Sequence, residues 1–501
     1  MTPPRTAPGA SRRRVFAGAT ALAAATIMGV DAHAHGFGQR YDLPVPLSLY
    51  LTGATAVVAV SFLIMALFFR RVHAVADYPR VDLLRFPVGR MLAHPVIRAP
   101  LRAAAVFFLI LVVVAGFFGN PAPVKNIAPI MVWAIWWVGM AYVCALLGNL
   151  WALVNPLDTI FTWVERIYAR LHHGAALARG LRYPQALGAW PAVALFFGFA
   201  WAELIWDQSD RPAYVAAATL AYCAITWTGM LLYGRRAWLA HGEVFALIFA
   251  LLGRFAPLEN RTAAGHAELN LRPYAVGLLI DEPVHSSLMV LVVMMLATVT
   301  FDGFMETPLW VEIADQMSVW LATPGAADGP HAIVATLGLA GMMLAFLAIY
   351  LSGAHLVARF AAADAPPRTT MAIARLFVFT LVPIAIGYHL AHYLSFVVSA
   401  FQYLIPLISD PLGLGWDLFG TALHIVRIGI VDARAIWYAS VIAIVLGHVA
   451  AVYLAHVMAV RVFGDRRAAL RSQYPMLALM LGYTMMSLWI IAQPIVSSRF
   501  G

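Results

Sequence analysis

Charged residues are scarce in this chain of 501 residues: Asp, Glu, Lys and Arg make up 11% of it, against about 25% in a usual soluble protein. Hydrophobic residues reach 62%. This composition excludes an ordinary soluble domain. Lys125 is the one lysine and Val124 precedes it, so the phosphate-binding loop of ATP-driven motors is absent. The two cysteines, Cys144 and Cys223, lie in apolar stretches without CxxC spacing, which argues against a disulfide framework or a thiolate zinc site.

Several catalytic signatures are also absent from the sequence. It has no GxSxG of serine hydrolases, no HExxH of zinc proteases, no CxxCH for covalent haem and no GxGxxG for dinucleotides. Any chemistry therefore depends on histidine and carboxylate side chains.

Apolar stretches of about 20 residues recur along the chain, and each is long enough to cross a hydrocarbon core as a helix. They predict an all-α fold, a polytopic membrane helix bundle with about ten transmembrane helices after an N-terminal signal segment. The expected spans are Leu47–Phe69, Ala103–Gly119, Ile127–Leu147, Leu187–Trp206, Ala213–Tyr233, Val284–Phe304, Ala332–Leu351, Leu376–Val398, Ala435–Val460 and Tyr474–Val496.

The basic residues divide unevenly between the connections. With the mature start placed outside, the inner connections hold 23 arginines, whereas the outer ones hold six basic residues. Because positive residues favour the cytoplasmic side, this predicts a multi-pass protein of the bacterial inner membrane with both termini on the periplasmic side. The net charge of +9 then indicates attraction to the anionic lipids of the inner leaflet rather than binding of nucleic acid.

The first 34 residues are typical of an export signal. Arg12, Arg13 and Arg14 precede an apolar run, and a small-residue pattern ends at Ala34. Cleavage there would leave His35 at the start of a single polytopic domain, residues 35–501; an uncleaved anchor is the alternative. Inside this domain, interfacial helices are expected near 157–172 and 236–256, of which the second could instead be re-entrant.

Ionisable residues inside a membrane each require a reason, because insertion costs roughly 2.5–3.5 kcal/mol. His389 and His392 lie three residues apart on an expected helix, so they could share a zinc or copper ion. His448, His331 and a free amino-terminal His35 are candidates for its remaining ligands. The alternative is that these histidines pack against neighbouring helices or carry protons.

Asp302 and Glu306 form the second candidate, since carboxylates four residues apart face one side of a helix. They could hold a metal or a proton, or act as a general base. Their position at the expected outer end of a span, where water is near, allows a purely structural explanation as well.

Three segments carry a resemblance to a known family: HGFGQRYDLPVP at residues 35–46, SDPLGLGWDLFGT at 409–421 and GHVAAVYLAH at 447–456. In these the chain resembles bacterial inner-membrane proteins described as fenitrothion hydrolases. The resemblance implies hydrolysis of lipophilic organophosphate triesters by a phosphoric triester hydrolase, and it assigns no catalytic residue.

We therefore expect a metal-dependent hydrolase at a site open to the outer leaflet, with His389 and His392 as zinc or copper ligands and Asp302 or Glu306 as ligand or base. Its partners would be the lipid bilayer, a lipophilic small molecule and possible further subunits, but not nucleic acid. Two alternatives remain open: a transporter or permease, and a metal-binding membrane partner of a copper or redox system.

Overall fold

The computed structural model describes residues 46–68, 77–263, 265–321, 330–362, 366–427 and 430–493. The expected signal segment and His35 lie outside these residues.

Ten helical segments in the described part of the chain are long and apolar enough to cross a membrane, and each overlaps one of the predicted spans. The prediction of a polytopic helical membrane protein is thus confirmed. The segments are α2 (Leu47–Phe68), α4 (Pro95–Phe118), α5 (Ile127–Pro129) with η4 (Ile130–Gly139) and α6 (Met140–Leu146), η5 (Gln185–Leu187) with α9 (Trp190–Leu204), α10 (Pro212–Tyr233), α13 (Ser286–Met305), α15 (His331–Ala361), α16 (Thr370–Phe377) with η7 (Val378–Leu381) and α17 (Val382–Ser409), α18 (Ala433–Phe463) and α19 (Arg466–Ala492).

Shorter elements fill the connections between these spans. They are β1 (Val81–Asp82), η2 (Leu83–Arg85), α3 (Pro87–Ala93), η3 (Pro123–Lys125), α7 (Trp151–Val154), α8 (Pro156–Leu171), α11 (Arg235–His241), α12 (Val244–Phe255), β2 (Leu258–Ala263), β3 (His266–Leu271), η6 (Val276–Leu278) and α14 (Pro308–Leu321).

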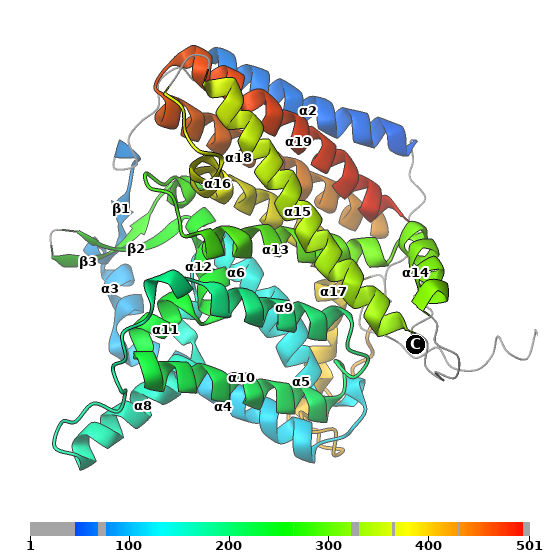
Figure 1. The fold of residues 1–501 in the computed structure, drawn as a ribbon. Coiled ribbons are helices and arrows are strands. Elements are labelled where there is room, and N and C mark those ends of the chain that lie inside the picture. Colours follow the sequence, from blue (N-terminus) through cyan, green and yellow to red (C-terminus); the bar gives the residue numbers. More distant parts are fainter. Residues whose placement is uncertain are drawn as a thin grey trace, which may run out of the picture.

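The three strands form a small antiparallel sheet in the order β1-β3-β2, and Leu271 of β3 lies opposite Val81 and Leu258. Gly265, with φ at +80°, supplies the left-handed backbone that the β2–β3 hairpin needs. The sheet lies at one end of the bundle and α14 at the other (Figure 1). We call these the sheet end and the α14 end.

The chain enters its first span and leaves its last one at the same end. Figure 1 shows that α2 begins, and α19 finishes, toward the α14 end. This agrees with an even number of crossings; which side of the membrane it faces stays a prediction.

The helix expected near 157–172 is α8, and the residue pair Asn155–Pro156 begins it as an N-cap and first-turn proline. Nη1 of Arg235, in α11, lies 2.6 Å from Oδ1 of Asp158 in the first turn of α8. Beyond that turn, its apolar side chains Trp163, Ile167 and others are exposed. An amphipathic surface of this kind suits the membrane interface, and that placement remains a prediction.

The segment expected at 236–256 differs from the interfacial helix that we favoured. It forms two helices, α11 and α12, bent by 63° at Gly242–Glu243. Glu243 is fully buried and caps α12 through the amides of Phe245 and Ala246. Most of α12 is buried against α6, α9 and α17, so it lies inside the bundle. Except for Arg254, which is exposed, the side chains of α12 are buried or half-buried.

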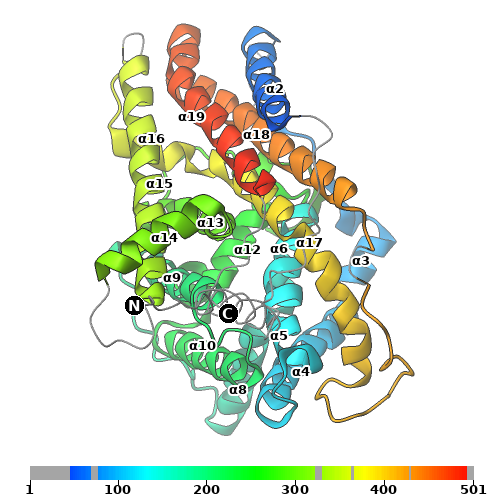
Figure 2. The same cartoon turned by 90° about the vertical axis from the view of Figure 1, so that its right-hand side faces the viewer.

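Two spans form the centre of the molecule. α13 is buried along nearly its whole length, and α17 runs diagonally between the two groups of helices (Figure 2). On one side lie α2, α15, α18 and α19, and on the other α4, α9 and α10 (Figure 1). Gly387 of α17 lies against Gly447 of α18, where a Cβ on Gly387 would come within 2.5 Å of the Ala443 carbonyl oxygen. Small residues at this crossing let the two backbones approach closely.

The third span contains a π-helix of ten residues, η4. Runs of π-helix are rare, and single π turns are frequent at functional sites. η4 packs against α17 and carries Trp136 and Trp137 toward the interior, so it borders the region described next.

Candidate functional site in the bundle core

A cluster of polar side chains lies where α13 and α17 meet. Asp302, in the last turn of α13, is only 2% exposed. Its Oδ2 atom lies 2.9 Å from Nε2 of His392 and accepts a hydrogen bond of 2.6 Å from the hydroxyl of Tyr393. Both partners come from α17, so the carboxylate of one central helix is bound by two consecutive residues of the other.

A second carboxylate joins the cluster from α9. The hydroxyl of Tyr393 lies 3.2 Å from Oε1 of Glu203, which is in the last turn of α9 and is partly buried. Tyr393 therefore stands between carboxyl groups of two different helices. We call Glu203, Asp302, His392 and Tyr393 the carboxylate cluster.

The number of protons in the cluster follows from its geometry. A tyrosine hydroxyl has one hydrogen to donate, whereas ionised carboxylates only accept. The shorter contact, to Asp302, takes that hydrogen. The contact to Glu203 becomes a full hydrogen bond when Glu203 carries a proton and donates it to the tyrosine oxygen. The geometry is thus compatible with a proton on Glu203.

The positions of the two carboxylates are unfavourable for negative charge. Glu203 and Asp302 both lie in the last turns of their helices, where the helix dipole disfavours negative charge. Burial within a membrane bundle adds a further cost. The imidazole of His392, with a side chain only 10% exposed, offsets part of this cost when it is protonated. Such an arrangement is typical of function rather than of packing.

A small cavity adjoins the cluster. Its lining includes Glu203, Tyr393, His389 and Trp137, and it offers about 30 Å³ to the centres of water molecules. One water needs about 10–15 Å³ on this measure. Nε2 of His389 is buried and has no hydrogen-bond partner among the residues that the structure describes, so the cavity wall holds a polar atom that a water could satisfy.

Of the residues singled out from the sequence, the structure brings Asp302 and His392 into direct contact. Glu306 is one turn further on, partly buried, as the C-cap of α13. His389 instead faces the third span, with its ring 5.7 Å from that of Trp137 and 5.8 Å from that of Tyr142.

The remaining candidates lie apart from one another. His448 is buried in α18, where its Nδ1 lies 2.9 Å from the carbonyl oxygen of Ile444. His331 is exposed at the start of α15. His35 lies outside the described residues. Within the residues that the structure describes, no group of three or more His, Cys, Asp or Glu side chains is placed to hold a metal ion. The zinc or copper site stays a prediction without a gathered ligand set.

Sequence reasoning missed the role of Tyr393, and it gave Glu203, a carboxylate in the predicted span Leu187–Trp206, no more weight than other carboxylates within spans. Tyr393 directly follows His392, and a tyrosine hydroxyl within a span needs a partner just as a histidine does. Glu203 stood out as a carboxylate inside a span, but nothing in the sequence indicates that α9 reaches α17.

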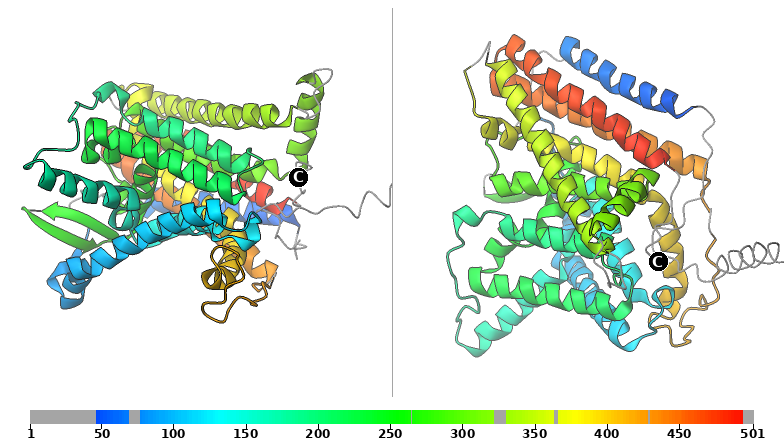
Figure 3. Two further views of the ribbon diagram at one scale, coloured as in Figure 1. Left: turned by 90° about the horizontal axis from the view of Figure 1, so that it is seen from below. Right: turned by 45° about the vertical axis from the view of Figure 1, so that its right-hand side comes forward.

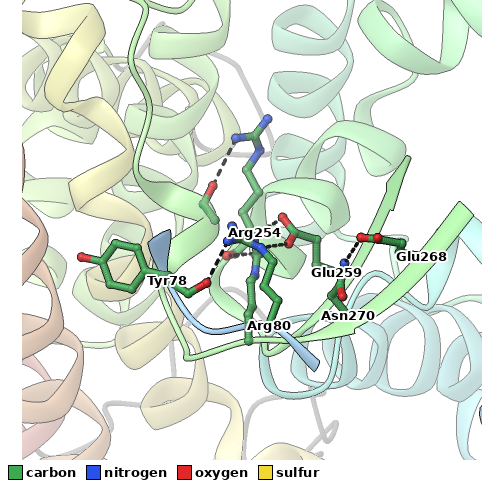
Figure 4. A network of polar contacts seen from close by, with 8 residues as sticks. Tyr78, Arg80, Arg254, Glu259, Glu268 and Asn270 are labelled. Carbon is green, nitrogen blue, oxygen red and sulfur yellow. Dashed lines mark hydrogen bonds and ion pairs between the residues drawn. The ribbon is translucent and has the colours of Figure 1, made fainter. Parts of the chain in front are cut away.

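A second polar cluster lies at the sheet end (Figure 4). Glu259 of β2 accepts from Nε of Arg80 at 3.0 Å and from Nη1 of Arg272 at 2.5 Å. Arg272 also donates to the backbone carbonyl of Arg254, and Arg254 donates to that of Gly277. Burial lowers the pKa of Arg272, and the carboxylate of Glu259 opposes that shift. This arginine network ties the sheet to α12 and η6.

Comparison with known proteins yields no match: no family model fits the chain, and no curated protein or solved structure is similar to it. The resemblance to fenitrothion hydrolases therefore stays a prediction. The fold and the geometry of the carboxylate cluster are the basis for assigning a function.

Proposed function

We propose that this membrane protein transports protons along a path that includes Glu203, Tyr393 and Asp302. The observation that carries the proposal is the hydroxyl of Tyr393, which lies 3.2 Å from one carboxyl group and 2.6 Å from another inside the bundle. Intramembrane carboxylates joined in this way are typical of proton relays.

The relay step is a concerted shift of two hydrogens. A proton on Glu203 moves to the oxygen of Tyr393 while the hydroxyl hydrogen of Tyr393 moves to Asp302. Each O–H bond that breaks is replaced by one that forms, so the tyrosine is unchanged and one proton has moved from Glu203 to Asp302. His392 holds Asp302 at 2.9 Å and, when protonated, balances the negative charge before the proton arrives.

The cavity beside Glu203 supports the same proposal. A hydronium ion that reaches this cavity from the aqueous side would pass its excess proton to Glu203, leave a water molecule behind, and so supply the first proton of the path. The pocket is otherwise lined by apolar groups such as Phe196, Ile248 and Met295, which limit leakage of other ions.

The hydrolase expected from the resemblance would use Asp302 and His392 on an organophosphate. Its metal-activated water lacks support from the described residues, since they hold no group of three potential ligands. The transporter alternative is therefore the one that we adopt, and triester hydrolysis becomes an outcome to measure beside it.

Proton uptake by proteoliposomes tests the proposal. Purified protein is reconstituted with a pH-sensitive dye inside the vesicles, and a potassium gradient with valinomycin makes the interior negative. We expect faster acidification than in empty liposomes. Asp302→Asn should abolish the difference, because an amide cannot take up the proton at that position.

Asp207→Asn is the matched control, since this exposed acid lies just beyond the same end of α9 and should leave uptake unchanged. Wild-type vesicles that behave like empty ones, or an Asp302→Asn variant as fast as wild type, would contradict the proposal. Release of nitrophenol from a nitrophenyl triester by the same preparation, without proton uptake, would point to the hydrolase instead.

A further inference from the structure

The loop between α17 and α18, which the structure describes at residues 410–427 and 430–432, carries many exposed apolar side chains. Leu423, for example, is 92% exposed. The large apolar residues exposed on this loop are Leu414, Trp416, Leu418, Phe419, Leu423, Ile425, Ile430 and Val431. A surface of this kind in water is unfavourable, and it marks a site of interaction.

Hydrogen bonds nevertheless fix the backbone of this loop, because its acidic side chains accept from amides in its turns. Asp410 accepts hydrogen bonds from the amides of Leu414 and Gly415, at 2.9 and 2.7 Å. Asp417 accepts from the amide of Ala422 at 3.0 Å. These carboxylates thus satisfy backbone donors that would otherwise need water.

Further hydrogen bonds hold the loop to the end of α17. The hydroxyl of Ser409 lies 2.7 Å from that of Thr421 and accepts from the amide of Phe419. Gln402 donates to the carbonyl oxygen of Arg427 and accepts from its amide, at 3.1 and 2.9 Å. The apolar side chains therefore project from a fixed backbone.

The loop is also attached to the turn between α4 and α5. The carbonyl oxygens of Leu412 and Pro411 accept from the amides of Asn120 and Ile127, at 2.7 and 3.0 Å. Both of these residues border membrane spans. Figure 2 shows the loop at the end of α17 next to α4, and Figure 3 shows it projecting from one side of the bundle.

We infer that this loop inserts its apolar side chains into the headgroup–acyl boundary of the bilayer at the α14 end. The inference is independent of the proton path. Three observations join in it: the exposed apolar residues, the attachment at the level of span ends, and the sideways projection of the loop.

The boundary region fits better than the hydrocarbon core. Irregular backbone facing lipid is excluded from the core, because its polar groups would lack partners. At the boundary, Trp416 can place its ring among the headgroups while Leu423 and Ile425 reach the acyl chains. Asp417 and Arg427 then remain within reach of water and lipid headgroups.

Site-directed fluorescence on the full-length protein in phospholipid vesicles tests this inference. A cysteine replacing Leu423 would carry an environment-sensitive NBD probe. The native Cys144 and Cys223 are buried at 0% and 2% exposure and should not react. We expect blue-shifted emission, about twofold quenching by lipids with a spin label near the headgroup, and little quenching by aqueous iodide.

Glu312→Cys on α14 is the matched control, since this exposed polar residue lies at the same end of the bundle. Its probe should respond to iodide and not to the spin-labelled lipid. The inference is overturned if the probe at position 423 behaves like the one at position 312, because the loop would then face water in a protein free of other partners. A probe at Ile425 provides an independent second position.

Discussion

The arginine network at the sheet end and the carboxylate cluster in the bundle core stabilise buried charge in different ways. At the sheet end, long arginine side chains converge on Glu259, and each guanidinium can donate several hydrogen bonds. In the bundle core, short side chains meet around a single hydroxyl, that of Tyr393. The first arrangement is built on arginines, which stay protonated, whereas the second contains carboxyl, imidazole and phenol groups.

The difference indicates what each cluster can do. Arginine stays protonated in proteins, so the arginine network of Figure 4 can fix the sheet against the helices but cannot carry a proton. Carboxyl, imidazole and phenol groups each lose and regain protons. Of these two clusters, the carboxylate cluster is the one that joins several such groups in the bundle core.

The strongest way to break this comparison is to remove the shared hydroxyl. Tyr393→Phe keeps the ring but disconnects Glu203 from Asp302, so proton uptake should fall about a hundredfold, as when a positioned proton-transfer group is lost. Tyr453→Phe is the control, since its hydroxyl pairs with Tyr78, 3.2 Å away and outside the relay. Equal uptake by the two variants would show that the hydroxyl of Tyr393 is only structural.

The converse test is made in the arginine network. Glu259→Ala leaves Arg80 and Arg272 without their common carboxylate, and we expect a loss of about 3 kcal/mol in unfolding free energy. Thermal unfolding in detergent measures it. Glu268→Ala, which loses only a bond to Asn270, should have a small effect. Proton uptake per folded molecule should not change in either variant.

A third test asks how much the close crossing of α17 and α18, next to the carboxylate cluster, contributes to stability. Gly387→Ala would force the helices apart at the Ala443 carbonyl and should cost about 1–3 kcal/mol. Gly341→Ala in α15 meets no atom within 4 Å and should be neutral or slightly stabilising. Thermal unfolding of the two alanine variants decides it, and matching melting temperatures would remove the crossing from the explanation.

The smallest effect is expected from Arg80→Lys. Lysine keeps the charge but loses the planar fork that binds Glu259 and the carbonyl oxygen of Tyr78, which should cost about 1 kcal/mol. The same unfolding measurement applies. If Arg80→Lys lost as much unfolding free energy as Glu259→Ala, the positive charge that lysine keeps would contribute little. Charge balance would then not be what distinguishes the arginine network from the carboxylate cluster.

Most of the fold was predictable because membrane helices are specified by local hydropathy. The ten spans and the start of α8 at Asn155 are examples. α12 was not, since its largely apolar sequence, Val244–Phe255, fits an interfacial helix as well as a buried one. The distinction depends on which helices cover it, and hydropathy does not contain that information.

The candidate site was predictable only in part. Asp302 and His392 stood out as ionisable groups within spans, but their contact depends on the packing of α13 against α17. His389 and His392 were expected to share one ligand because they are three residues apart. They point about 60° apart around α17, so one reaches α13 and the other reaches η4.

The unequal lengths of the spans have a consequence for the membrane itself. α13, with 20 residues, is about 30 Å long and matches a hydrocarbon core, whereas α15 and α18, with 31 residues each, are about 46 Å long. Tilting shortens the extent of the long helices across a membrane, and Figure 1 shows α15 sloping across the bundle. A change in bilayer thickness is absorbed by their tilt but meets a mismatch at the short spans. We therefore expect lipid chain length to act unequally on the long and the short spans.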